Sequence, residues 1–181
     1  MRTFALTVII LILCNFSSRA QERLSSEDIE NLKVQIESDV LKLQDSLLSV
    51  EQIVEQPYWV DINCDLYRVR ELRSRRIDID WSTAGMTKAV FDEEKGYDEL
   101  LNKYYKLLKS KLSIEDQTEL LNSQRNWLKF RDSERKVNGL LCNEEYSGGG
   151  SIQSNIRASK YCSITEQRLT EIIGYLNRIV E

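Results

Sequence analysis

The stretch "YDELLNKYYKLLKSKLSIEDQTELLNSQRNWLKFRD", residues 97–132, decides the fold because it holds the end of one helical pattern and the start of the next. Apolar side chains recur at helical spacing over residues 83–111, and "SIED" at 113–116 is a capping-box pattern that begins a second helix reaching about Leu141. Only one or two residues separate the two helices. We therefore predict an antiparallel helical hairpin that turns near residue 112.

One face of the second helix is polar and aromatic. Gln124, Trp127, Arg131 and Glu134 or Arg135 follow one another at helical neighbour spacing, so their side chains share that face. In a hairpin this face lies opposite Tyr97 and Asp98. We expect Trp127 to pack near Tyr97, and Arg131 to find a carboxylate or carbonyl partner, because a half-buried guanidinium without one is costly. The cluster is predicted to hold the scaffold together.

The remainder of the chain is also predicted to be helical, which makes the fold class all-α. It has one proline and seven glycines, and residues 21–57 contain a long amphipathic helix capped by Ser25 or Ser26. Its apolar stripe packs on the chain's own domain or, as the alternative, pairs with another chain by self-association of residues 26–56. Residues 58–181 form the helical domain. Within it, residues 58–82 are expected to be part helix and part connection, and a capping box at Ser163 is expected to start the last helix.

The first twenty residues have the pattern of a secretory signal peptide. "MRTFALTVIILILCNFSSRA", residues 1–20, has an early arginine, an apolar run and a small-residue end, so cleavage is expected after Ala20. A retained anchor and a lipoprotein modified at Cys14 are the alternatives. Removal of this segment takes away Arg2 and Arg19, so 23 basic residues face 29 acidic ones and the net charge falls from −4 to −6. We expect a periplasmic or secreted protein without a nucleic-acid partner.

The chain contains no histidine. It therefore lacks the Ser-His and Cys-His catalytic pairs, His-ligated metals and the usual near-neutral proton shuttle. We expect no catalytic residue, no metal, no cofactor and no small-molecule substrate. A hydrolase based on two carboxylates remains a third hypothesis, although nothing in the sequence marks two acids as special.

Several short motifs are similar to those of the lysozyme inhibitor LprI family, small exported bacterial proteins with an all-helical domain. The resemblance spans roughly residues 60–175 and implies a binding module whose partner is a lysozyme, with its motif residues chiefly in the core. The motifs are "TAGM" at 83–86, "GGS" at 149–151, Cys162 in "CSITEQR", and the residues Asp98, Leu101, Asn102, Tyr105, Gln124, Trp127, Arg131, Asp132, Thr165 and Arg168. Many lysozymes are strongly cationic, so an acidic partner would gain in encounter rate.

The resemblance also carries implications for the cysteines. Family members have cysteines at the places of Ala89 and Arg135, which are equidistant from the predicted turn and would face each other across the hairpin. Cys64 and Cys162 match the outer cysteine positions of the family, which implies a disulfide between them. A bond from Cys142 to Cys162 is the alternative; otherwise Cys142 is free or pairs between chains.

The sequence offers one exposed segment suited to partner contact. The loop "NEEYSGGGS", residues 143–151, places Glu144, Glu145, Tyr146 and Ser151 around three glycines that allow close approach. A simple chain reversal between two helices is the alternative for this loop. The second hypothesis for the whole protein is a structural or assembly role in the cell envelope, exerted through the N-terminal helix.

Overall fold

The computed structural model describes residues 23–50, 56 and 58–179, and this part of the chain contains helices and no strand. The predicted all-α class is confirmed. The predicted signal peptide at 1–20 and the predicted extension of the first helix over 51–55 lie outside the described residues. The helices are α1 (Ser26–Leu48), α3 (Trp59–Ile79), α4 (Thr83–Ser110), α5 (Ile114–Leu141), α6 (Glu144–Ser147) and α7 (Ile152–Leu176).

Serine caps begin three of the long helices. Ser25 forms a capping box with Asp28 at the start of α1, Ser82 accepts a hydrogen bond from the Gly85 amide at the start of α4, and Ser113 caps α5. Each cap satisfies a backbone N–H that has no partner within the helix. The predicted helices over 83–111 and from 113 to about 141 are confirmed.

Residues 58–82 are part helix and part connection, as predicted: α3 runs from Trp59 to Ile79, and residues 80–82 lead into α4. One boundary prediction is wrong. The last helix begins at Ile152, eleven residues before the predicted capping box, so Ser163 lies inside α7 and its hydroxyl donates to the Lys160 carbonyl. A serine inside a helix can donate its hydroxyl hydrogen to a carbonyl of the preceding turn. In that position it does not cap a helix start, although the local sequence has the capping pattern.

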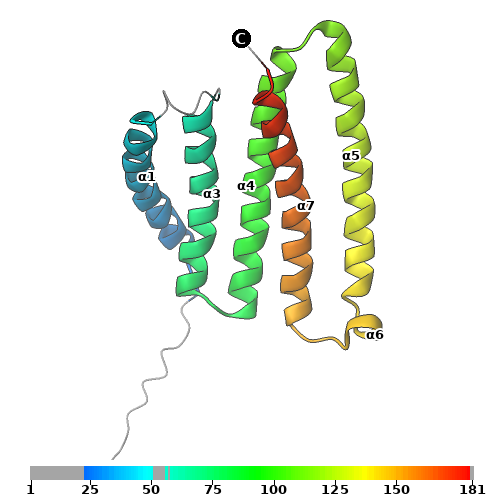
Figure 1. The fold of residues 1–181 in the computed structure, drawn as a ribbon. Coiled ribbons are helices and arrows are strands. Elements are labelled where there is room, and N and C mark those ends of the chain that lie inside the picture. Colours follow the sequence, from blue (N-terminus) through cyan, green and yellow to red (C-terminus); the bar gives the residue numbers. More distant parts are fainter. Residues whose placement is uncertain (1–22, 51–55, 57, 180–181) are drawn as a thin grey trace, which may run out of the picture.

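The helices stand side by side, in the spatial order α1, α3, α4, α7, α5 (Figure 1). The chain does reverse between α4 and α5, but α7 lies between them, and α5 packs on α7 instead of on α4. The predicted direct packing of the hairpin arms is therefore not confirmed. The reason is that α7 buries more apolar surface than α5 does. Ala158, Leu169 and Ile172 of α7 are completely or almost completely buried, whereas Leu120 is the buried residue of α5.

Two apolar clusters form the core. The main core joins α3, α4, α5 and α7 around residues such as Tyr97, Leu101 and Leu169. A smaller cluster joins α1 to α3 through Ile36, Val40, Val60 and Cys64. The apolar stripe of α1 thus packs on its own domain, as the first of the two sequence interpretations predicted. Among the described helices, none combines the length and apolar character needed to cross a bilayer.

Candidate functional site

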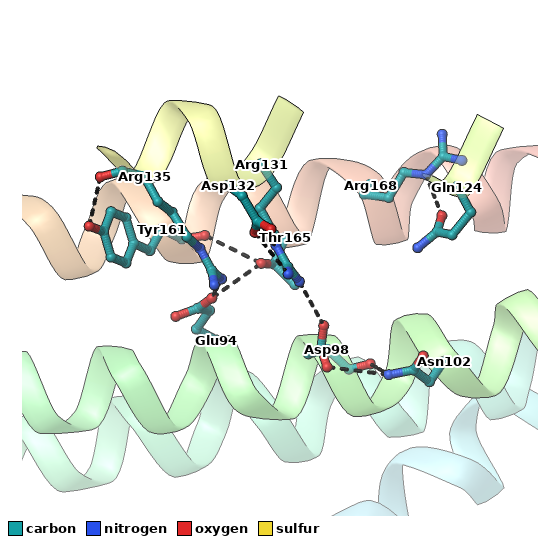
Figure 2. Close-up of polar contacts among 10 residues, drawn as sticks. All are labelled: Glu94, Asp98, Asn102, Gln124, Arg131, Asp132, Arg135, Tyr161, Thr165 and Arg168. Carbon is teal, nitrogen blue, oxygen red and sulfur yellow. Dashed lines mark hydrogen bonds and ion pairs between the residues drawn. The ribbon is translucent and has the colours of Figure 1, made fainter. Parts of the chain in front are cut away.

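The predicted polar motif residues on α4, α5 and α7 take part in three separate groups of side-chain contacts, which we call together the polar network (Figure 2). Arg168 is its most buried charged member, with 4% of its surface exposed. Its Nε donates to Gln124 Oε1 at 3.0 Å, its Nη2 to Ser123 Oγ at 3.0 Å, and its Nη1 to Glu171 Oε2 at 3.0 Å. Two of these bonds cross from α7 to α5. Because the guanidinium fork is planar and rigid, they also fix the register of the two helices.

Arg131 on α5 reaches in the other direction, towards α4. Its Nη1 lies 3.7 Å from Asp98 Oδ1, and its Nε and Nη2 bind the neighbouring Asp132 at 3.1 and 3.0 Å. The guanidinium also stacks over the Trp127 ring, 5.3 Å from its centre. Asn102 donates to the Asp98 carbonyl at 2.8 Å. The expectation that Arg131 finds a carboxylate partner is confirmed.

The sequence named Arg135 and Thr165, but it did not predict the contacts that they make in a third group of Figure 2. Arg135 on α5 pairs with Glu94 on α4, and its guanidinium lies 5.2 Å from the centre of the Tyr161 ring on α7. Tyr161 Oη donates to the Arg135 carbonyl at 2.8 Å, and the fully buried Thr165 places its hydroxyl 3.4 Å from Glu94 Oε1. The opposite charges of residues 94 and 135 were a usable signal, but their meeting beside α7 could not be foreseen from a two-helix hairpin.

The aromatic pairing predicted within the motif is not confirmed. Trp127 is half-buried and packs against the main core that contains Tyr97, yet the ring contacts among the described residues do not include this pair. Tyr97 Oη instead lies 3.1 Å from Arg70 Nε and 3.2 Å from Glu166 Oε1, on the side of α3 and α7. Leu101 is buried in the same core, and Tyr105 packs against it.

The structure does not show the predicted disulfide between Cys64 and Cys162. Cys64, Cys142 and Cys162 are all free thiols. Cys64 belongs to the core between α1 and α3, whereas Cys162 belongs to the main core and donates to Glu93 Oε2 at 3.4 Å. Burial raises the pKa of both the Cys64 and the Cys162 thiol, so each is held in its neutral form. The alternative bond from Cys142 to Cys162 is not formed either.

The two positions expected to face each other across the hairpin also lie apart. Ala89 is buried and lines a cavity of about 420 Å³ between α1, α3 and α4, together with Ile36 and Arg76. Arg135 turns instead to Glu94 and Tyr161. Long arginine side chains of α5 still reach α4, as Arg135 reaches Glu94, but equal distance from the turn does not by itself set which residues meet.

The predicted partner-contact loop is exposed throughout its charged and aromatic part. Glu144, Glu145 and Tyr146 form most of the short helix α6, and Ser151 precedes α7; all four are exposed. Gly148, Gly149 and Gly150 follow with φ values of 74°, 77° and 91°. These values are accessible to glycine at little cost, so the three glycines are required by the backbone path. These loop side chains face solvent, whereas Thr165 and Arg168 of the polar network are buried.

Burial governs the ionisation of the groups around Glu93. The most strongly buried acid, Glu93, has its pKa raised by burial, with Arg73 opposing the shift from 3.3 Å. Its neighbours Cys162 and Tyr97 have raised pKa values as well, again through burial, so neither is activated as a nucleophile. Within the described ranges there is no group of three or more Cys, Asp or Glu side chains arranged to hold a metal ion.

Fold and network together define a small all-helical scaffold whose motif residues bind one another and whose loops and helix ends face outwards. The family model "Lysozyme inhibitor LprI" matches residues 79–172, which is more than half of the chain. The chain belongs to the LprI family. The match starts at the end of α3, later than the resemblance suggested, so α1 and most of α3 lie outside it. No curated protein and no solved structure gives a significant match.

Proposed function

We propose that the protein is an exported, non-enzymatic binding module that inhibits lysozyme in the cell envelope or outside the cell. The observation that carries the proposal is the family match over residues 79–172. The network of α4, α5 and α7 supports it, because the residues shared with the family motifs are present and engaged with one another. Their role is to hold the scaffold, which leaves recognition to the exposed surface.

Electrostatics favours the proposed partner. The full chain carries a net charge of −4, and loss of residues 1–20 would make it −6. An acidic inhibitor and a cationic lysozyme attract each other over distances of about a Debye length, roughly 8 Å at physiological salt. The association rate should therefore rise as salt is lowered. The absence of histidine from the sequence agrees with a protein that binds without performing chemistry.

The test is inhibition of purified lysozymes of different classes by the chain that starts at Gln21. Clearing of a peptidoglycan suspension is followed at low and at physiological salt. We expect inhibition of at least one cationic lysozyme, stronger at low salt. An unrelated acidic protein of equal net charge serves as the control for non-specific attraction. Lysis unaffected at both salt concentrations, for every class, would rule the proposal out.

A second candidate function is assembly through α1, and one observation favours it. Val34, Leu41 and Leu48 lie seven residues apart and are 71%, 64% and 49% exposed, on the face of α1 opposite the buried stripe. A line of apolar side chains at this spacing is typical of helix pairing, although it is narrower than a full coiled-coil seam. α1 stands at one edge of the molecule and packs on α3, so this face is open (Figure 1).

The assembly candidate is tested by the variant Leu41→Glu. Removal of residues 21–57 is a poorer test, because it would uncover the core residues Val60 and Cys64 of α3. If the chain assembles through α1, size-exclusion chromatography shows a dimer that becomes a monomer on this substitution. A monomer before and after the substitution would reject the candidate and leave the inhibitor proposal untouched.

A further inference from the structure

One end of the molecule carries a group of exposed apolar side chains. Here α5 leads through α6 into α7, at the lower right of Figure 1. We name this group, together with the two acids of α6, the tip. Its apolar members are exposed by 46% at the least and 58% at the most. They are Val137, Leu140, Leu141, Tyr146 and Ile152.

The apolar side chains of the tip do not pack in the hydrophobic core. α5 is held to α7 by the Arg168 and Arg135 contacts and by the buried Leu120, and these lie on the inner face of α5. Single exposed apolar residues are ordinary on protein surfaces. The tip has five large exposed apolar residues within sixteen residues of sequence, at the end of α5. Such a concentration is typical of an interaction surface.

The backbone of the tip has a defined shape before any partner arrives. The Tyr146 amide donates to the Asn143 carbonyl, and Ser147 Oγ accepts from the Gly149 amide at 3.0 Å. A Cβ placed on Gly149 would come within 3.3 Å of Glu144 Cγ, so this glycine lies against the glutamate stem. A preformed loop loses less conformational entropy on binding, and more of the contact energy therefore appears as affinity.

Charge identifies the kind of partner. Residues 137–152 contain Glu144 and Glu145 and no lysine or arginine. Two copies of such a surface repel each other, and an anionic membrane repels it as well, whereas a cationic protein is attracted. Exposed apolar and aromatic groups beside acids are the combination that an interface with a basic protein needs, with the aromatic ring as the usual anchor.

We infer that the tip is the surface through which the protein docks on a cationic face of lysozyme, with Tyr146 as its central anchor and Glu144 and Glu145 as its charged rim. This inference rests on the proposed function and adds the place of contact to it. It extends the loop predicted from the sequence by the exposed end of α5 and the first turn of α7.

The test compares tip variants with matched variants at the opposite end of α5. Leu141→Ser is matched by Ile114→Ser, since Ile114 is exposed by 81%. The charge reversal Glu144→Lys/Glu145→Lys is matched by Glu115→Lys/Glu119→Lys, whose wild-type side chains are also exposed. Tyr146→Ala completes the set. Each variant is first checked by thermal unfolding and then assayed for affinity to a purified cationic lysozyme by calorimetry.

We expect Tyr146→Ala and the Glu144/Glu145 reversal to weaken binding by about tenfold or more, and the Ile114 and Glu115/Glu119 variants to change it less than about twofold. The reversal should also reduce the salt dependence of association. Tip variants that bind like the wild type would overturn the inference and leave the proposed function standing. A wild-type chain that binds none of the lysozymes at either salt concentration would overturn both.

Discussion

Replacement of Arg168 by methionine should release α5 from α7. In the wild type the guanidinium donates three hydrogen bonds of 3.0 Å from a side chain that is 5% exposed. Hydrogen bonds from a charged donor are worth about 1.5–3 kcal/mol each. Burial of the cation costs several kcal/mol, which offsets part of that gain. Methionine keeps the apolar stem, so we expect a net loss of about 2–4 kcal/mol in the free energy of unfolding.

The assay is equilibrium urea unfolding, supported by thermal melts. For a chain of this size a loss of about 3 kcal/mol lowers the midpoint temperature by roughly 6–12 °C. Arg125→Met is the matched control, because Arg125 is an exposed arginine of α5 that lies next to Gln124. A double-mutant cycle of Arg168→Met with Gln124→Ala should give a coupling energy of about 1 kcal/mol. A stability of Arg168→Met within about 0.5 kcal/mol of the Arg125 control, or a coupling near zero, would refute the role of this side chain as a clamp.

Three further predictions concern the core. Trp127→Ala should cost about 1–3 kcal/mol in urea unfolding, less than a fully buried aromatic, because the indole is half-buried; a loss above about 4 would contradict this. Burial raises the pKa of Glu93 in the folded protein above its ordinary 4.5, so ionisation of this residue opposes folding of the wild type as pH rises from 4 to 7. The variant Glu93→Gln cannot ionise there, so its stability relative to the wild type should increase over this range. Thermal melts that show the same stability difference at pH 4 and pH 7 would count against this prediction. In the chain from Gln21, a thiol reagent should modify Cys142 in the native protein and Cys64 and Cys162 only in denaturant, three thiols in all; a single reactive thiol in denaturant would instead show a disulfide.

Local signals of the sequence predicted most helix starts correctly. Ser113 and Ser25 cap helices because a serine oxygen can accept an orphan backbone N–H, and this depends only on residues within three positions. The start of α7 was missed because the same pattern at Ser163 is compatible with a helix interior. A capping pattern shows that a cap can form, but neighbouring apolar spacing from Ile152 onwards decides whether the chain is already helical there.

The order of helices in space could not be predicted from the turn alone. A short connection between α4 and α5 requires that the chain reverse, but it does not require the two helices to touch along their length. The choice between α5 and α7 as the main neighbour of α4 depends on which helix offers more apolar surface, and this is α7. The pairing of Trp127 with Tyr97 and the opposition of Ala89 to Arg135 both assumed a scaffold without α7 between α4 and α5. The disulfide of Cys64 with Cys162 was instead implied by the family resemblance, and the structure does not show it.

On α5 the motif residues Gln124 to Asp132 precede the tip, which begins at Val137, and this separation predicts two kinds of defect. Arg168 and Arg131 fix how α5 lies against α7 and α4, and thereby fix where the tip points. A change in the network should therefore lower stability and displace the tip, and under the proposed function the affinity for lysozyme should fall together with the free energy of unfolding. A change at Tyr146 removes a side chain that supports nothing in the core, so binding falls alone. Arg168→Met should lower the affinity. A second change that restores the attachment of α5 to α7 at another position should restore it. This result would show that the network affects recognition only through the position of the tip.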